Sequence, residues 1–151
     1  MNSKINLSED EKDCLQELMN VAYGNATAAI TEILDAYAKL SIPKIQIINS
    51  SELKAHLSRE LNLDVEHLVS LQQINGTISG ENMFVIDKQS AINIAYKFGL
   101  SEDEINDNEL LDIVLEITNI LSSSTISKLA EDIDTNVSFS APSIKSLTSI
   151  N

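Results

Sequence analysis

Apolar residues recur at the helical period in two long stretches of this sequence. The first stretch follows Ser8 and extends to about Ala38, and the second runs from about Asn108 to Ile133. A spacing of three and four residues places apolar side chains on one face of an α-helix, so the pattern predicts two long amphipathic helices. The apolar positions are Leu15, Leu18, Val21, Ala22, Ala29, Ile30, Ile33 and Leu34 in the first helix, and Leu110, Leu111, Val114, Ile117, Ile120, Leu121, Ile126 and Leu129 in the second.

Between the two helices, the pattern becomes that of β-strands. Residues 44–48 are rich in isoleucine and follow a proline that ends the first helix, which predicts a strand there. Residues 68–78 and 83–86 predict the two strands of a hairpin, joined by a turn at 79–82. A returning strand is expected at 137–143, after the second long helix.

Shorter helices are expected on both sides of the hairpin. One spans about 51–61, and the other spans 88–98 and ends at Gly99, a common C-terminal stop. The segments Ser8–Glu11 and Ser101–Glu104 both have the pattern of a capping box. In that motif a serine hydroxyl and a glutamate carboxylate satisfy free amides at the start of a helix.

A glycine inside the first long helix predicts a close contact with another backbone. Gly24 is about 1 kcal/mol less favourable than alanine in a helix interior, so its presence needs a reason. Small residues lie nearby at Ala26, Ala28 and Ala29, and residues 122–124 are serines in the corresponding region of the second helix. We therefore expect the two long helices to pack across these small residues.

Size and charge limit the classes of function. A chain of 151 residues with 43% apolar residues is expected to form one domain, residues 1–151, with a substantial core. The net charge of −13 and the absence of a basic patch argue against binding nucleic acid through its phosphates. An acidic surface favours solubility and a partner with a basic rim.

Cysteine, histidine and hydropathy predict a cytoplasmic protein without its own metal site. Cys14 is the only cysteine and falls on the apolar side of the first helix, so we expect a buried thiol in a reducing compartment. His56 and His67 have no cysteine or second histidine at ligand spacing. The start of the chain does not lead into a signal sequence, and no run approaches 18 uncharged apolar residues, so no membrane contact is expected.

Four polar and proline residues of the first half return in the second half at the same spacings. The first set is Asp13, Glu17, Asn20 and Pro43. The second set lies 99 positions further on and consists of Asp112, Glu116, Asn119 and Pro142. On a helix, positions i, i+4 and i+7 share one face, so each half presents a carboxylate and a carboxamide side by side. The repeat predicts two similar halves, residues 8–98 and a shortened 101–151.

The repeated pattern Asp-x3-Glu-x2-Asn-x22-Pro resembles that of the CheC, CheX and FliY phosphatases of bacterial chemotaxis. The resemblance implies removal of phosphate from the aspartyl-phosphate of a CheY-like receiver domain. In that family the asparagine amide orients a water in line with phosphorus, and the glutamate pairs with a lysine of the receiver. By position, these roles fall to Asn20 with Glu17, and to Asn119 with Glu116. Asp13 and Asp112 are assigned as supporting residues, or as plain solvated acids.

The implied chemistry requires little from the chain itself. An acyl phosphate is already activated, and the receiver domain brings its own Mg²⁺, so we expect no cofactor on this chain. Placement of water is a major part of catalysis in phosphoryl transfer. A carboxamide can donate to and accept from that water, and it cannot become a charged competing nucleophile.

The resemblance also implies an α/β fold of two pseudo-symmetric halves. Two long antiparallel motif helices are expected on one face of a largely antiparallel sheet. A CheC-like chain would continue from residue 151 into another hairpin, so we expect an exposed sheet edge. Such an edge suggests a homodimer that shares strands, as in CheX. A CheD-like regulator is a further partner that the sequence neither supports nor excludes.

Two other functions stay open at this point. A non-catalytic receiver-binding or flagellar-switch module would use the same helix faces without needing the amides. A structural protein would carry the motif residues as ordinary solvated helix surface, because a single Glu-x-x-Asn pattern is a weak signal.

Overall fold

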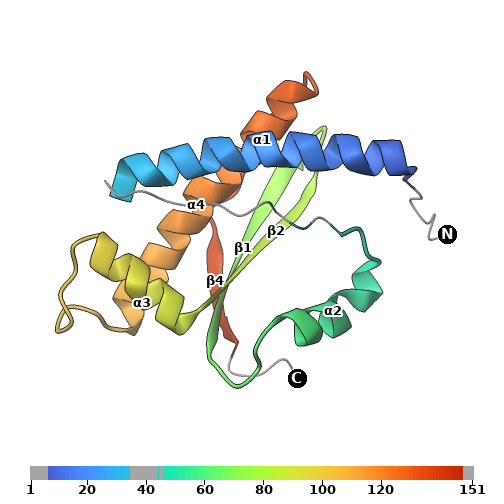
Figure 1. Ribbon diagram of the computed structural model, residues 1–151. Helices are drawn as coiled ribbons and strands as arrows, with labels where there is room; N and C mark the ends of the chain where they lie inside the picture. Colours follow the sequence, from blue (N-terminus) through green and yellow to red (C-terminus); the bar gives the residue numbers. More distant parts are fainter. Residues whose placement is uncertain (1–6, 35–43, 45, 148–151) are drawn as a thin grey trace.

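The computed structural model describes residues 7–34, 44 and 46–147, and Figure 1 shows the order of their elements. These elements are α1 (Glu9–Leu34), η1 (Ser50–Glu52), α2 (Leu53–Glu60), β1 (His67–Gly76), β2 (Gly80–Asp87), α3 (Lys88–Lys97), α4 (Asp107–Asp132), β3 (Val137–Phe139) and β4 (Ser143–Leu147). The structure confirms both long helices, the hairpin and the helix after it. The predicted end of the first helix near Ala38 lies outside the described residues.

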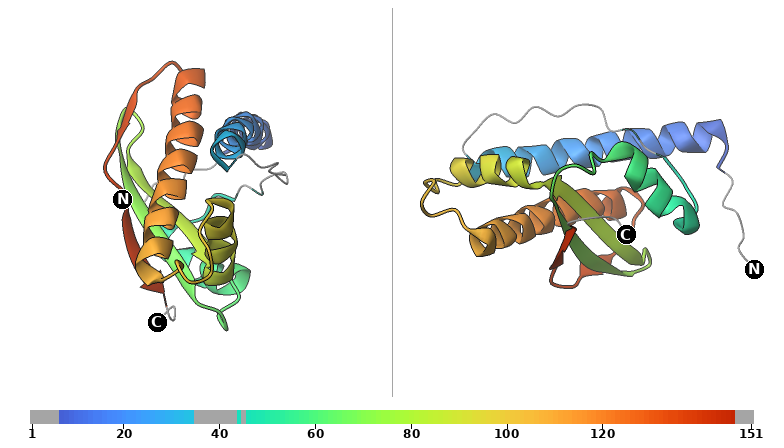
Figure 2. Two further views of the ribbon diagram at one scale, coloured as in Figure 1. Left: turned by 90° about the vertical axis from the view of Figure 1, so that its left-hand side faces the viewer. Right: turned by 90° about the horizontal axis from the view of Figure 1, so that it is seen from below.

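Two long helices and a small antiparallel sheet make up the fold, which agrees with the predicted class. Helix α4 lies against the sheet, and α1 packs against α4 (Figure 2). The capping box at Ser8 forms as predicted, because the Ser8 N–H donates to the Glu11 carboxylate at 2.7 Å and the Glu11 N–H donates to Ser8 Oγ at 3.2 Å.

Strand β1 is the centre of the sheet and pairs along both of its edges. On one edge β2 pairs antiparallel with it, from His67–Asp87 to Ile74–Gly80. On the other edge β3 and then β4 pair antiparallel with it. The hairpin turn lies at 77–79, earlier than the predicted 79–82, because Gly80 already belongs to the ladder.

The strand on the far edge of β1 contains a bulge at residues 140–142. Between the pair Ile74–Phe139 and the pair Leu71–Ser143, β1 advances by three residues and its partner by four. One extra residue against a regular strand bends the chain and leaves part of the ladder unpaired. The predicted returning strand is therefore divided into β3 and β4.

Local groups at the bulge replace the missing ladder. The Ser140 N–H donates to the Gln73 carbonyl at 3.0 Å, and the Gln73 N–H donates to Ser140 Oγ at 3.0 Å. Pro142 has no N–H to donate and is therefore tolerated at a bulge. It stands directly before β4, in line with its predicted place at the start of a strand.

The predicted strand at residues 44–48 is wrong for the described part of that segment. Residues 44 and 46–48 have no strand structure, and Ile47 is 50% exposed. The 99-residue shift of the repeat carries this segment onto β4, which does pair with β1. Both edges of β1 are already paired, with β2 on one side and with β3 and β4 on the other, so this segment cannot take a place beside β1 like that of β4.

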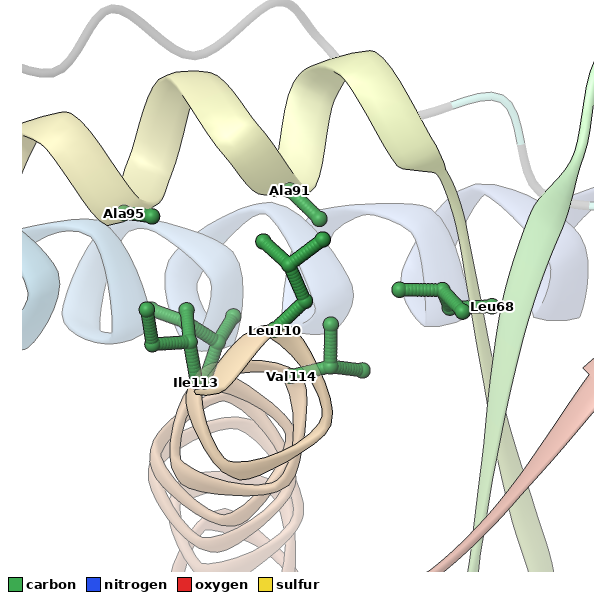
Figure 3. Packing of buried hydrophobic residues seen from close by; sticks show 7 residues of the cluster. Leu68, Ala91, Ala95, Leu110, Ile113 and Val114 are labelled. Carbon is green, nitrogen blue, oxygen red and sulfur yellow. The ribbon is translucent and has the colours of Figure 1, made fainter. Parts of the chain in front are cut away.

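The hydrophobic core lies where α3 and α4 meet β1. Ala91 and Ala95 stand one turn apart on α3 and face α4, which lets the two helices approach closely (Figure 3). The predicted core positions Leu110, Val114 and Ile117 are all buried. The full cluster is Leu68, Ala91, Ala95, Leu110, Ile113, Val114 and Ile117.

Helix α1 packs against α4 through two alanines rather than through its glycine. Ala22 and Ala26 are fully buried. Gly24 is exposed, and a Cβ added to it would meet no atom within 4 Å. The predicted close approach at Gly24 is therefore wrong, although the two helices do pack across small residues.

The predicted buried face of α1 is only partly buried. Val21 is 51% exposed and Ile33 is 47% exposed. Cys14 is also exposed, so the predicted buried thiol is wrong. Hydrophobic periodicity indicates a helix, but it does not fix how much of its apolar face a neighbour covers, and α1 packs chiefly against α4.

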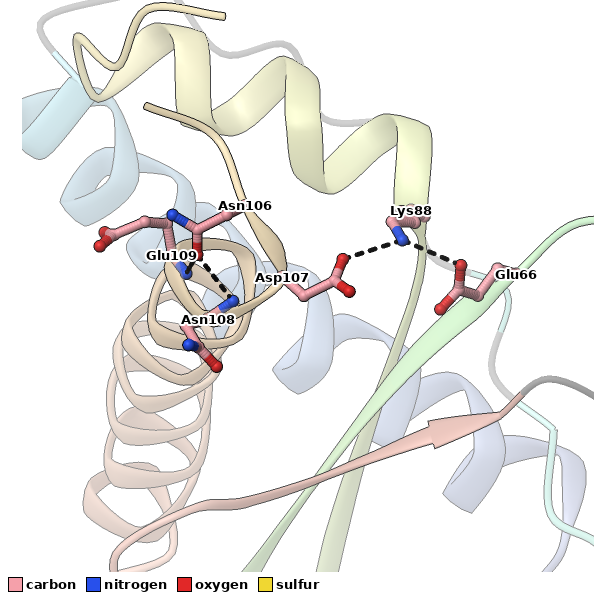
Figure 4. A network of polar contacts seen from close by, with 6 residues as sticks. All are labelled: Glu66, Lys88, Asn106, Asp107, Asn108 and Glu109. Atoms are coloured by element: carbon pink, nitrogen blue, oxygen red, sulfur yellow. Dashed lines mark hydrogen bonds and ion pairs between the residues drawn. The ribbon is translucent and has the colours of Figure 1, made fainter. Parts of the chain in front are cut away.

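Lys88, the first residue of α3, binds carboxylates at the starts of β1 and α4. Lys88 Nζ donates to Glu66 at 3.1 Å and to Asp107 at 3.0 Å (Figure 4). The hydrogen bond to Asp107 and then that to Glu66 raise the pKa of Lys88 above its ordinary value. Beside it, Asn106 caps α4, because its side-chain oxygen accepts from the backbone N–H groups of Asn108 and Glu109 in the first turn. The second motif helix is thereby fixed to the hairpin at its N-terminus.

Replacing the cap of α3 is expected to destabilise the fold measurably. Asp87 accepts hydrogen bonds from Ser90 N at 2.9 Å and from Ser90 Oγ at 2.6 Å. We expect Asp87→Ala to lower the free energy of unfolding by about 1 kcal/mol, and Asp87→Asn to lower it less, because an amide oxygen can still accept. Urea denaturation of the three proteins at pH 7 measures both losses.

The same cap predicts a dependence on pH. The Ser90 hydroxyl, followed by the Ser90 N–H, lowers the pKa of Asp87 below its ordinary value of 3.8. Because the folded pKa is the lower one, the charged cap contributes stability above pH 3.8 and loses it as pH falls through the folded pKa. The difference between wild type and Asp87→Ala should therefore shrink in acid, and a constant difference would contradict this assignment.

Candidate functional site

The structure places all six predicted site residues on the exposed surface of the two long helices. On α4, residues 113, 114, 117 and 118 are buried, so the motif between them forms a narrow exposed stripe. The exposed residues are Asp13, Glu17 and Asn20 on α1, and Asp112, Glu116 and Asn119 on α4. Exposure is a condition for touching another protein, while the role of each residue stays a prediction. Pro43 lies outside the described residues.

The motif glutamates and asparagines line none of three pockets that occur in the described part of the chain. These three pockets have volumes of about 430, 360 and 140 Å³, and of the motif residues only Asp13 borders one of the three, that of about 430 Å³. Sites for small molecules are usually concave. Helix surface of this kind fits contact with a protein better.

The two asparagines differ in their surroundings. The Oδ1 atom of Asn119 accepts a hydrogen bond from Gln72 Nε2 at 3.3 Å. Across the described residues, the side chain of Asn20 has no hydrogen-bond partner, and no hydrogen bond or ion pair joins one motif to the other. Two motifs that are alike in sequence are thus unlike in structure.

Sequence reasoning missed Gln72, the residue that contacts Asn119. Alternate residues of β1 face α4, and Gln72 lies among them with 1% of its surface exposed. A glutamine at an inward position of a predicted strand is a signal in itself, because buried polar side chains need partners. Nothing in the sequence indicates which residue the partner is.

The contact between α4 and the sheet changes from apolar to polar along the helix. Beyond Ile117, the inward residues Thr118 and Ser122 are buried. Asn82 Nδ2 of β2 donates to Ser122 Oγ at 2.5 Å. The second motif therefore lies beside a buried polar layer between helix and sheet, and this layer contains Gln72.

The described residues show no metal-binding cluster, and one of their helices has the length and composition of a membrane span. Among the described residues, no group of three or more His, Cys, Asp or Glu side chains could hold a metal ion. Helix α4 is long and apolar enough to cross a membrane by length and composition alone, a condition that core helices of soluble proteins also meet. In this fold it lies between the sheet and α1.

Residues 68–151 match the family model described as chemotaxis phosphatase CheX. This segment is more than half of the chain, and it includes the second motif and Gln72 but not the first motif. No curated protein sequence matches the chain.

Two solved structures have a similar fold. FliY of Thermotoga maritima has a TM-score of 0.76 and 24% identity, over 95% of this chain and 71% of that chain. The chemotaxis protein CheX of Desulfovibrio desulfuricans has a TM-score of 0.59 and 16% identity, over 89% of this chain and 84% of that chain. At these identities the likeness concerns the fold alone, and it agrees with the predicted class.

Proposed function

Because the chain belongs to the CheX family of chemotaxis phosphatases, we propose that it hydrolyses the aspartyl-phosphate of a CheY-like receiver domain. The observation that carries this proposal is the exposed stripe of Glu116 and Asn119 on α4, within the segment that matches the family. The receiver acts in the cytoplasm, and we place this protein there as well.

In the proposed reaction, Asn119 holds a water molecule in line with the phosphorus atom. The water attacks phosphorus, the bond between phosphorus and the aspartyl oxygen breaks, and the products are inorganic phosphate and a free carboxylate. Glu116 lies one turn before Asn119 on the same face and pairs with a lysine of the receiver, which fixes the two proteins in register. Mg²⁺ belongs to the receiver, where it stabilises charge on the phosphoryl oxygens.

The first motif is proposed as a second site of the same kind. Glu17 and Asn20 are equally exposed and have the same spacing on α1. They lie outside the segment that matches the family, so we assign the larger share of activity to the second motif. Asp13 and Asp112 are proposed to support their neighbouring pairs. A homodimer and a CheD-like regulator stay predictions.

The proposal is tested by following phosphate loss from a phosphorylated receiver. The receiver carries a labelled phosphoryl group on its aspartate and is incubated with a much lower molar concentration of this protein. The release of inorganic phosphate is then measured over time. We expect release to be faster than the spontaneous rate, with many turnovers per molecule. A panel of receivers is used, because the sequence does not identify the substrate.

Binding is measured in the same series, since it separates the two leading functions. A receiver carrying a beryllofluoride group in place of phosphate allows affinity to be measured without hydrolysis. Binding without faster phosphate loss would select the receiver-binding or flagellar-switch module instead. Neither binding nor acceleration across the panel would reject both.

A further inference from the structure

We propose that Gln72 is a positioning residue that fixes the orientation of the Asn119 carboxamide and thereby makes the two motifs unequal. This inference rests on the proposed phosphatase function. Gln72 does not reach the surface, because only 1% of it is exposed, so it acts through Asn119.

The direction of the Gln72 side chain follows from the bulge in the neighbouring strand. Gln72 Nε2 donates to the backbone carbonyl of Ser140 at 2.9 Å. A carbonyl can only accept, so the nitrogen end of the glutamine amide must face Ser140. The second N–H of the same nitrogen then points at Asn119, which must present its oxygen. The bulge thus sets the orientation of both amides.

Burial of the glutamine supports a specific role. Within the described residues, Gln72 Oε1 is buried without a hydrogen-bond partner. A buried polar atom without a partner is destabilising, and an apolar residue would avoid that penalty. Gln72 is also one of the largest side chains that are fully buried. Unlike an apolar residue, Gln72 can donate two hydrogen bonds, one to Ser140 and one to Asn119.

Holding Asn119 in place matters because an exposed asparagine side chain without a partner can adopt several rotamers. Its oxygen has two lone pairs, of which Gln72 occupies one, so the other lone pair and the Nδ2 hydrogens stay available to water. A side chain that is ordered before the receiver binds loses less freedom on binding. Asn20, which has no hydrogen-bond partner in the described part of the chain, lacks this restraint.

The test measures each motif separately. Asn20→Ala leaves activity through Asn119 alone, and Asn119→Ala leaves activity through Asn20 alone. Gln72→Met is introduced into both backgrounds, because methionine keeps the length of glutamine but has no donor. With the Asn119 motif, we expect kcat to fall on the order of 10-fold with little change in KM. With the Asn20 motif, we expect no change.

The matched control is Ser70→Ala. Ser70 is fully buried two residues before Gln72 on the same face of β1, and its Oγ has no hydrogen-bond partner in the described residues. This variant alters the same buried layer without touching Asn119, so both motifs should keep their kcat. Urea midpoints of all variants show how far each substitution affects folding.

Different outcomes separate failure of this inference from failure of the proposed function. Loss of kcat in both backgrounds would show that Gln72 is merely structural, and no loss with the Asn119 motif would overturn its positioning role. If neither the wild type nor any variant accelerates phosphate loss, the phosphatase proposal is rejected and the kinetic test of Gln72 has no readout. Side-chain NMR relaxation of the wild type then still decides, because the Asn119 amide should be more rigid than that of Asn20, and equal mobility would overturn the inference.

Discussion

Replacing Asn20 and Asn119 together by alanine is expected to lower the stimulated rate of aspartyl-phosphate hydrolysis by about 10²-fold or more. Loss of one well-placed hydrogen-bonding group in an active site typically has an effect of this size. Both residues are exposed, so the fold should be kept, because surface substitutions usually change stability by less than about 0.5 kcal/mol. The measurement is phosphate release at several concentrations of phosphorylated receiver.

Two other asparagines serve as controls for this double variant. Asn25 is exposed on α1 and Asn108 is exposed near the start of α4, and neither belongs to a motif. Replacing both by alanine removes the same atoms from the same helices and should leave the rate unchanged. Full activity in the motif variant, or an equal loss in the control variant, would contradict the assignment of the amides.

The long helices and the hairpin could be predicted because their signals are local. The sequence predicts this helix at about 108–133, and α4 spans Asp107–Asp132. Periodic apolar residues and caps act over a few positions, and both are visible in sequence. The same is true of the exposed stripe at Asp112, Glu116 and Asn119, because three residues on one helix face remain together whatever packs on the other faces.

The wrong predictions concern the burial of side chains and the pairing of strands. The sequence predicts a buried thiol at Cys14 and a close backbone contact at Gly24, but both residues are exposed. Residues 44–48 have the composition of a strand, yet their described part is not one, and the place beside β1 that the repeat would give this segment is taken by β4. Burial and pairing depend on distant parts of the chain, and a local pattern does not identify them.

The contacts of Gln72 illustrate the same limit at the candidate site. Its hydrogen bonds reach across 47 positions to Asn119 and 68 positions to Ser140. The 99-residue repeat relates the motifs but not their surroundings. Equal roles for the two asparagines therefore do not follow from the repeat alone. The division into halves at 8–98 and 101–151 stays a prediction.

Leu110→Ala is expected to give the largest loss of stability among the predictions made for this fold. Leu110 is 3% exposed and lies at the centre of the core, between the two alanines of α3 and Val114 (Figure 3). Removing a buried leucine side chain loses its transfer free energy and leaves a cavity, which together lower the free energy of unfolding by about 2–5 kcal/mol. The neighbouring side chains on α3 are Ala91 and Ala95, which are too short to fill the space that the leucine leaves.

The size of this loss can be judged against a leucine outside the core. Leu63 is 50% exposed, and Leu63→Ala removes the same atoms with an expected loss of about 1 kcal/mol or less. Urea denaturation of wild type and both variants measures the two losses. Since small domains are stable by only about 5–15 kcal/mol, Leu110→Ala should also lower the thermal midpoint clearly. Equal losses at the two positions would mean that α3, α4 and β1 do not share the core described here.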